Sequence, residues 1–203
     1  MRVPNPRPTI LEVERKFRRL AVPTLTQNGG IPPFQSLRAL RATTIHDIYF
    51  DKADVLCNAG TWVRRRNGAW EAKIRKGGDR TNSRFEELTD TRDIAACIQR
   101  ITGIDMKAER DFGLGKMAEF TTTREAWVAD GVFCIVRDRM DFGHEVGEVE
   151  LQVEMEGVTE EGKRRVMAEM DGRIGAFMQR YAWAFAPGKP VGKLSAYFEA
   201  RRR

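Results

Sequence analysis

Long apolar runs are missing from this chain of 203 residues. No stretch approaches the ~20 consecutive apolar residues that a membrane-spanning helix needs, and the segment from Met1 to Pro8 has no apolar core of the signal-peptide kind. We therefore expect a cytoplasmic protein that does not enter a membrane. Internal repeats, low-complexity tracts and linkers rich in Pro or Gly are also absent. Residues 1–203 are accordingly predicted to form a single domain.

Cysteine and histidine are scarce. The 3 cysteines (Cys57, Cys97 and Cys134) are widely spaced and form no CxxC pair, which indicates neither a disulfide framework nor a zinc site. We expect reduced thiols with structural roles. The 2 histidines, His46 and His144, lack the spacing of a metal-binding pair, and His144 is predicted to lie in a turn.

Charged residues, by contrast, are abundant. Lys and Arg number 35 against 29 Asp and Glu, which gives a net charge of +6. Such a balance indicates an anionic partner without defining its kind. Hydrophobic residues make up 41% of the chain, which is ordinary for a globular protein with a core of its own.

Most of the chain is predicted to be extended, with helices at the connections. Extended segments bounded by Gly, Asp or Asn occur at residues 9–18, 43–51, 60–66, 69–76, 84–88, 118–128, 132–138 and 146–155. Apolar residues with helical spacing occur at Phe34, Leu37 and Leu40, at Ile94, Ile98 and Ile101, and from Val166 to Tyr181. The last helix is expected to begin after Thr159, because a hydroxyl followed by acidic residues satisfies a helix N-terminus.

The segment TWVRRRNGAWEAKIRK predicts a hairpin. Asn67 and Gly68 both accept the positive φ angles of a type I′ turn, and that turn would set Trp62 opposite Lys73. One face of the hairpin would then carry Trp62, Arg64, Arg66, Glu71, Lys73 and Arg75. Taken alone, such a charged face is most often simply solvated.

Two further segments repeat this pattern with acidic residues. In TILEVERKF one face carries Glu12, Glu14 and Lys16, and in GEVELQVE one face carries Glu148 and Glu150. An eight-stranded antiparallel sheet can close into a barrel with a polar interior, and these faces would then look inward together. Carboxylates suit Mg²⁺, and guanidinium groups suit phosphate oxygens. This combination predicts a polyphosphate substrate.

These motifs resemble the CYTH superfamily of triphosphate tunnel metalloenzymes. The resemblance rests on ExExK at residues 12–16 together with GEVE at residues 147–150. Within the superfamily, LEVERKF, DIYFD, WVRRRNGAWEAK, EEL, REAW, DFGHEVGEVE and GKL look most like the thiamine triphosphatase branch. The resemblance implies an α+β fold in which peripheral helices surround an eight-stranded antiparallel tunnel. It also implies Mg²⁺-dependent hydrolysis of thiamine triphosphate to thiamine diphosphate and phosphate.

The resemblance also implies roles for individual residues. The metal-binding carboxylates of the family match Glu12, Glu14, Asp138, Glu148 and Glu150. The triphosphate-binding positions match Lys16, Arg64, Arg66, Lys73, Arg124 and Lys193. Trp62 matches the aromatic residue that covers the thiazolium ring, where a cation meets the negative face of an indole. Tyr49 matches the tyrosine that partners the catalytic lysine, here Lys16, and Glu87 matches an acidic position to which we assign no role.

Alternatives to this function stay open at the level of sequence. The same fold could serve an inorganic triphosphatase, a nucleoside triphosphatase or an adenylate cyclase. A basic polyanion-binding module without catalysis is the rival from another class, although paired carboxylates would repel a polyanion. Burial and nearby cations lower the pKa of Lys16 while Glu12 and Glu14 raise it, so its protonation is undecided. We expect a monomer whose partner is a small-molecule triphosphate rather than a nucleic acid or a membrane.

Overall fold

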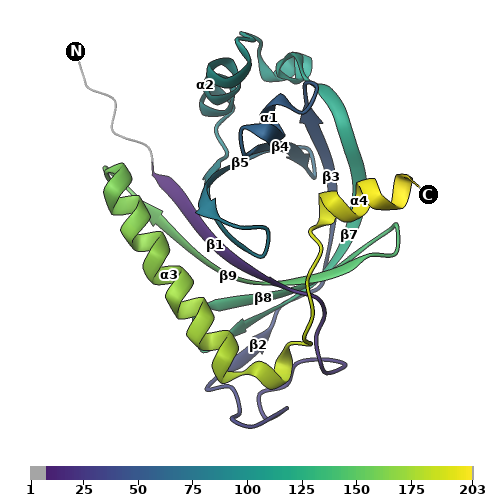
Figure 1. Ribbon diagram of the computed structural model, residues 1–203, viewed down its shortest axis with the longest axis vertical. Helices are drawn as coiled ribbons and strands as arrows, with labels where there is room; N and C mark the ends of the chain where they lie inside the picture. Colours follow the sequence, from purple (N-terminus) through teal and green to yellow (C-terminus); the bar gives the residue numbers. More distant parts are fainter. Residues whose placement is uncertain (1–7, 203) are drawn as a thin grey trace.

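A closed antiparallel barrel forms the centre of the protein, and its helices pack against the outside (Figure 1). The computed structural model describes residues 8–202; residues 1–7, on which the expectation about a signal peptide rests, and Arg203 lie outside them. The strands are β1 (Thr9–Phe17), β2 (Leu37–Ala39), β3 (Thr43–Asp51), β4 (Thr61–Arg66), β5 (Ala69–Gly78), β6 (Asn82–Leu88), β7 (Gly115–Ala129), β8 (Phe133–Met140) and β9 (Glu145–Met155).

Strand pairing confirms the predicted barrel. Within the described residues the sheet runs in the order β2-β7-β3-β4-β5-β6-β1-β9-β8, and an additional pairing between β7 and β8 closes it. Each of the eight predicted strands takes part in the closed ring. The ninth strand, β2, pairs with the end of β7 outside the ring. Closure leaves no free edge in the ring, so its backbone hydrogen bonds are satisfied all the way round.

The hairpin of β4 and β5 has the predicted register. Asn67 (φ 47°) and Gly68 (φ 89°) form the turn, and Trp62 lies opposite Lys73 in the ladder. The ladder between β5 and β6 is less regular, because its register shifts between Arg75 and Gly77. This β-bulge is local, because pairing resumes with Gly77 opposite Arg84 and Gly78 opposite Ser83.

Helices cover the barrel on several sides. They are α1 (Val55–Asn58), α2 (Thr91–Thr102), α3 (Glu160–Arg180) and α4 (Lys193–Arg201), with short 3-10 segments η1 (Ala108–Gly113) and η2 (Ala182–Ala184). The long α3 crosses the outside of β1 and β9 (Figure 1). Thr159 caps α3 as predicted, accepting a hydrogen bond from the backbone of Gly162. No helix in the described part of the chain is long and apolar enough to cross a membrane.

The helix predicted around Phe34, Leu37 and Leu40 is wrong. Leu37–Ala39 is strand β2, which pairs with Ala129, Val128 and Trp127 of β7. Phe34 enters the core instead, with its ring centroid 4.5 Å from that of Tyr181. The apolar spacing was compatible with a helix, but hydrogen bonds to the exposed end of β7 determined the structure of this segment. Helices α1 and α4 were not predicted.

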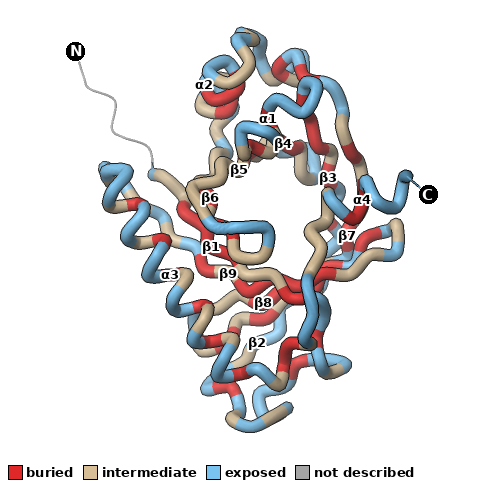
Figure 2. The backbone as a smooth tube through the Cα atoms, in the orientation of Figure 1, coloured by how far each residue is buried: buried red, intermediate tan, exposed pale blue. Residues whose placement is uncertain are grey.

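The two faces of β1 have opposite environments, and this alternation positions the site. Leu11 and Val13 are fully buried on the outer face, in a core that includes Ile174 of α3. Glu12 and Glu14 are also buried, but on the inner face. The buried residues therefore follow the barrel wall as well as its contact with α3 (Figure 2).

An ionic bridge fastens α3 to the barrel. Asp171 of α3 accepts hydrogen bonds from Arg15 of β1 at 2.7 Å and from Arg84 of β6 at 2.9 Å. Burial alone would raise the pKa of Asp171, but the hydrogen bonds from Arg84 and Arg15 outweigh it and hold that pKa below its ordinary value. The bridge therefore favours the ionised carboxylate.

We expect Asp171→Asn to lower the free energy of unfolding at pH 7 by about 1–2 kcal/mol, because it removes a charged partner from both arginines. Because the folded pKa is lowered, this contribution is present above the unfolded pKa of about 4 and is lost as pH falls through the folded pKa. Urea unfolding at pH 7 and pH 3 should therefore show a difference between variant and wild type that shrinks at pH 3. Glu169→Gln, at an exposed position of the same helix, is the matched control. An equal loss in that variant would contradict the assigned role of the bridge.

Candidate functional site

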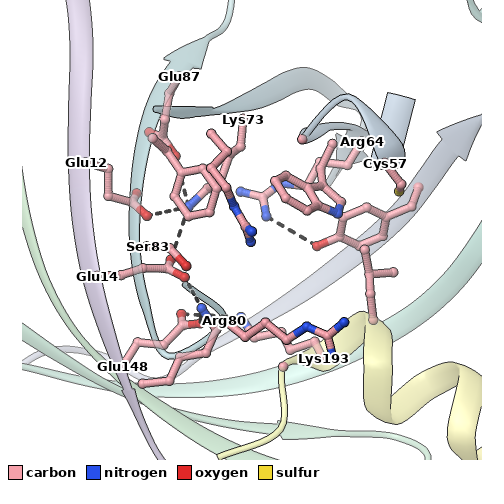
Figure 3. Close-up of a pocket in the computed structure, with 18 of the residues that line it drawn as sticks. Glu12, Glu14, Cys57, Arg64, Lys73, Arg80, Ser83, Glu87, Glu148 and Lys193 are labelled. Atoms are coloured by element: carbon pink, nitrogen blue, oxygen red, sulfur yellow. Dashed lines mark hydrogen bonds and ion pairs between the residues drawn. The ribbon is translucent and has the colours of Figure 1, made fainter. Parts of the chain in front are cut away.

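The barrel interior contains a cavity of about 1120 Å³. Its wall includes every site residue predicted from the sequence except Asp138. Acidic side chains lie along one side and cationic side chains approach them from several strands (Figure 3). Residues 189–195, at the start of α4 and just before it, complete the wall. The strand alternation seen in the sequence thus brings the predicted residues together.

Three carboxylates form the acidic centre of the cavity. Glu14 of β1 and Glu148 and Glu150 of β9 each offer an oxygen atom, and these atoms lie within 4.8 Å of one another. The pairing of β1 with β9 places them, because Glu14 lies directly opposite Glu150. Glu14 and Glu148 are buried, and Glu150 is partly buried. Direct pairing of the first and last strands therefore brings these predicted metal-binding carboxylates together.

Crowding of these carboxylates disturbs their ionisation. Burial and then the charge of Glu12 raise the pKa of Glu150 to about 8, and burial together with Glu148 raises the pKa of Glu14. Burial would raise the pKa of Glu148 as well, but Lys193, Lys16 and Arg124 outweigh it and hold that pKa well below its ordinary value. Burial and mutual repulsion thus favour a proton on part of this group, and a divalent cation bound by the same oxygens would take the place of that proton.

Two lysines flank this acidic centre. The ammonium of Lys16 contacts Glu14 and lies 3.5 Å from Glu148, and Lys193 lies 3.8 Å from Glu148. Burial would lower the pKa of Lys16, but Glu148 and Glu14 outweigh it and the pKa is raised. Lys16 is therefore protonated while both carboxylates face it.

Asp138 is fully buried and does not line the cavity. Arg124 donates two hydrogen bonds to its carboxylate, at 2.8 and 2.7 Å, and the ammonium of Lys193 lies at 2.5 Å. Burial would raise the pKa of Asp138, but Lys193 and Arg124 outweigh it and lower the pKa. Asp138 thus positions two of the predicted phosphate-binding cations, and its assignment as a metal ligand stays a prediction.

Glu12 likewise contacts a cation. The ammonium of Lys73 lies 2.5 Å from Glu12 and 3.1 Å from Glu87, and Gln152 donates a hydrogen bond to Glu12 at 2.8 Å. Burial would lower the pKa of Lys73, but Glu12, Glu14 and Glu87 outweigh it and raise the pKa. Glu87, to which the sequence assigned no role, therefore holds a lysine of the cavity.

The remaining predicted arginines have one carboxylate partner each. Arg64 contacts Glu71 at 2.7 Å, and one of its other nitrogens donates a hydrogen bond of 3.4 Å to the hydroxyl of Tyr49. Arg66 donates two hydrogen bonds of 2.8 Å to Asp47. Tyr49 thus belongs to the arginine side of the cavity, whereas Lys16 lies among the glutamates.

The predicted ring-binding residue Trp62 lies among aromatic and cationic groups. The guanidinium of Arg75 lies 5.0 Å from the centre of the Trp62 ring, and the Phe85 ring lies 5.8 Å away at an interplanar angle of 89°. Arg75 lines the cavity. Its strand parity with Lys73 could have identified it, although it was left out of the predicted site.

Other wall residues had no sequence signal. Arg80 lies in the turn between β5 and β6, where no periodicity applies, and Lys189 lies in the irregular segment before α4. Cys57 also lines the cavity; burial and then the neighbouring Asp51 raise the pKa of its thiol to about 12. It therefore remains a protonated thiol at neutral pH, in agreement with the structural role expected of it.

The sequence profile of the CYTH domain matches residues 11–170, and the chain therefore belongs to the CYTH family. Among curated proteins it is similar to human thiamine-triphosphatase, with 29% identity over 93% of this chain and 86% of that protein. The corresponding protein of Macaca fascicularis is 28% identical over the same shares.

Solved structures show the same fold. The PH1819 protein of Pyrococcus horikoshii OT3 aligns with a TM-score of 0.56 and 15% identity, over 93% of this chain and 98% of that one. HpAC1 from Hippeastrum, described as having a dominant triphosphatase activity, aligns with a TM-score of 0.53 and 18% identity, over 93% of this chain and 95% of that one.

If the carboxylates of the acidic centre hold a divalent cation, we expect Mg²⁺ at ten times its dissociation constant to raise Tm by roughly 3–6 °C, because a ligand that binds only the folded protein stabilises it. Glu150→Gln should abolish this shift without loss of stability, since the amide resembles the protonated carboxyl favoured by a pKa of about 8. Thermal unfolding with Mg²⁺ and with EDTA would measure the effect. Glu154→Gln, at an exposed position of the same strand, should keep the wild-type shift. A full shift in Glu150→Gln would contradict the assignment.

Proposed function

We propose that the protein is a Mg²⁺-dependent hydrolase of small-molecule triphosphates and that thiamine triphosphate is among its substrates. The observation that carries this proposal is the juxtaposition, in one cavity, of the carboxylates of Glu14, Glu148 and Glu150 with the cations Lys16, Arg124 and Lys193. Membership of the CYTH family and the named activity of the curated relatives support it.

The metal is proposed from the donor set itself. Mg²⁺ prefers carboxylate oxygens and retains several waters, and Glu14, Glu148 and Glu150 supply three carboxyl groups whose oxygen atoms lie within 4.8 Å of one another. When bound, the ion would neutralise charge on the phosphates and polarise the reacting phosphoryl group. Glu12 and Asp138 are further candidate ligands, and both would first have to leave their present cationic partners.

The cations would bind the triphosphate and stabilise its charge. Lys16, Arg64, Arg66, Lys73, Arg124 and Lys193 all line the cavity. Each of them has a carboxylate partner now, so phosphate oxygens would exchange with carboxylates rather than meet unpaired charge. The carboxylates stay in the cavity after such exchange, so the added negative charge of the triphosphate would have to be offset by a bound metal ion. In phosphoryl transfer most of the catalysis comes from positioning and charge stabilisation of this kind.

The water that attacks the terminal phosphorus needs a proton acceptor. We propose Lys16 with Tyr49 for this role, as their match to the family positions implies. Glu14 and Glu148 keep Lys16 protonated while both face its ammonium, so it can accept a proton only when these carboxylates are engaged elsewhere. Until then Lys16 serves as a phosphate-binding cation.

Inorganic triphosphate is the second candidate substrate, and a specific observation favours it. The indole of Trp62, which would cover a thiazolium ring, already has a guanidinium over it. Inorganic triphosphate has no organic head group, so its binding would leave the contact between Arg75 and Trp62 intact.

Phosphate release should be measured from thiamine triphosphate, inorganic triphosphate and ATP, with Mg²⁺ and with EDTA. We expect turnover that EDTA abolishes, and a loss of about a hundredfold or more in kcat for Glu150→Gln, since the metal supplies several kcal/mol of charge stabilisation. Glu154→Gln should behave like wild type. Turnover that survives removal of both Glu148 and Glu150 would contradict the proposed metal site. Salt-sensitive binding of polyanions without any turnover would instead favour a protein that binds polyanions through its cations alone.

The proposed base makes a separate prediction. Tyr49→Phe should reduce kcat by roughly a hundredfold and move the pH optimum, because general acid–base catalysis contributes at least that much. The pH–rate profile of the variant would be compared with that of wild type, with binding of inorganic triphosphate measured alongside. An optimum that stays in place with kcat nearly unchanged would remove Tyr49 from the mechanism.

A further inference from the structure

Arg75 differs from the six predicted phosphate-binding cations of the cavity wall in having no ion-pair partner among the described residues. Lys16, Arg64, Arg66, Lys73, Arg124 and Lys193 each contact a carboxylate. Within residues 8–202, Arg75 forms no ion pair, and no group accepts a hydrogen bond from its buried Nε atom. Its charge is stabilised by the indole of Trp62 instead, at 5.0 Å from the ring centre.

The backbone holds Arg75 in this place. The amide of Arg75 donates a hydrogen bond of 2.8 Å to the carbonyl of Gly60, next to the strand that carries Trp62. A Cβ atom on Gly60 would lie 3.3 Å from the Cβ of Arg75, and Gly60 has a φ of +70°. The register of the ladder between β5 and β6 shifts directly after Arg75 and resumes with Gly77 opposite Arg84. The side chain of Arg75 lies over the indole of Trp62, and both residues line the cavity.

A cationic ring and this guanidinium would compete for Trp62. The face of an indole attracts one cation, and two like charges at that distance repel each other. On the face that Arg75 covers, a thiazolium would have to displace the guanidinium, whose charge would then lose its stabilising contact. An anionic or uncharged head group meets no such conflict, and the unpaired Nε–H of Arg75 could donate a hydrogen bond to it.

We propose that Arg75 is a specificity-determining residue of this site: it occupies the Trp62 indole and so selects triphosphates whose head group is not cationic. The inference rests on the proposed function, because it concerns which triphosphate the same cavity accepts. It assigns inorganic triphosphate, or a triphosphate with an uncharged head, as the better substrate of the wild-type protein.

The test is the ratio of kcat/KM for thiamine triphosphate to that for inorganic triphosphate. Arg75→Gln should raise this ratio by roughly fivefold, the size of one cation–π contact, whereas Arg75→Lys retains the charge and should stay near wild type. Arg65→Gln is the matched control, because Arg65 lies over Trp70 at 5.7 Å on the other face of the same hairpin. In a Trp62→Ala background the Arg75 substitution should leave the ratio unchanged.

The outcomes separate the two proposals. An unchanged or lower ratio in Arg75→Gln, an equal rise in Arg65→Gln, or a rise that persists without Trp62 would overturn the role of Arg75. If wild type releases phosphate from no triphosphate, the proposed function fails. The role of Arg75 is then decided by calorimetric binding of thiamine diphosphate and inorganic diphosphate to the same variants. An increase of roughly fivefold in their affinity ratio for Arg75→Gln alone would support it.

Discussion

Charge balance inside a closed barrel is the constraint on which the rest of this structure depends. Ring closure turns one face of every strand toward a confined interior, and here those faces carry carboxylates and cations. A buried charge without a partner is costly, so these groups pair across strands, as Lys73 does with Glu12 and Arg124 with Asp138. The pairs hold the interior in place, and under the proposed function each cation would exchange its carboxylate for a phosphate oxygen.

The outside of the barrel makes this interior possible. Leu11 and Val13 alternate with Glu12 and Glu14 on β1 and are buried beneath α3. Hydrophobic burial on the outer face supplies the favourable free energy, at about 25 cal/mol per Å², while the inner face is left for charged groups that contribute little net stability. The barrel itself is therefore apolar on its outer face and polar in its interior. The helices cover the apolar outer face, so the protein as a whole still has a buried apolar core.

Sequence reasoning succeeded where local rules determine geometry. The turn at Asn67 and Gly68 fixed which residues of β4 and β5 share a face, and period-2 alternation placed Glu14 and Glu148 inward. It failed where distant packing determines conformation. Leu37 pairs with β7 despite helical spacing, and α4 lies over the cavity because Tyr197 packs against Phe120, with ring centroids 5.6 Å apart. The partners of Asp138 and Glu87 likewise depend on which strands meet across the barrel, and one strand does not contain that information.

The β-bulge after Arg75 has a consequence for how this protein could diverge. Because the ladder is already irregular there, residues beyond the bulge can change in identity, and even in number, without shifting the strand register that aligns the glutamates and lysines deeper in the barrel. Under the proposal made for Arg75, the residue that selects the head group lies at the border of this irregular part of β5, whereas Lys73 lies in the regular ladder opposite Glu87. A lineage could alter what the substrate carries at one end while retaining unchanged the machinery for the other.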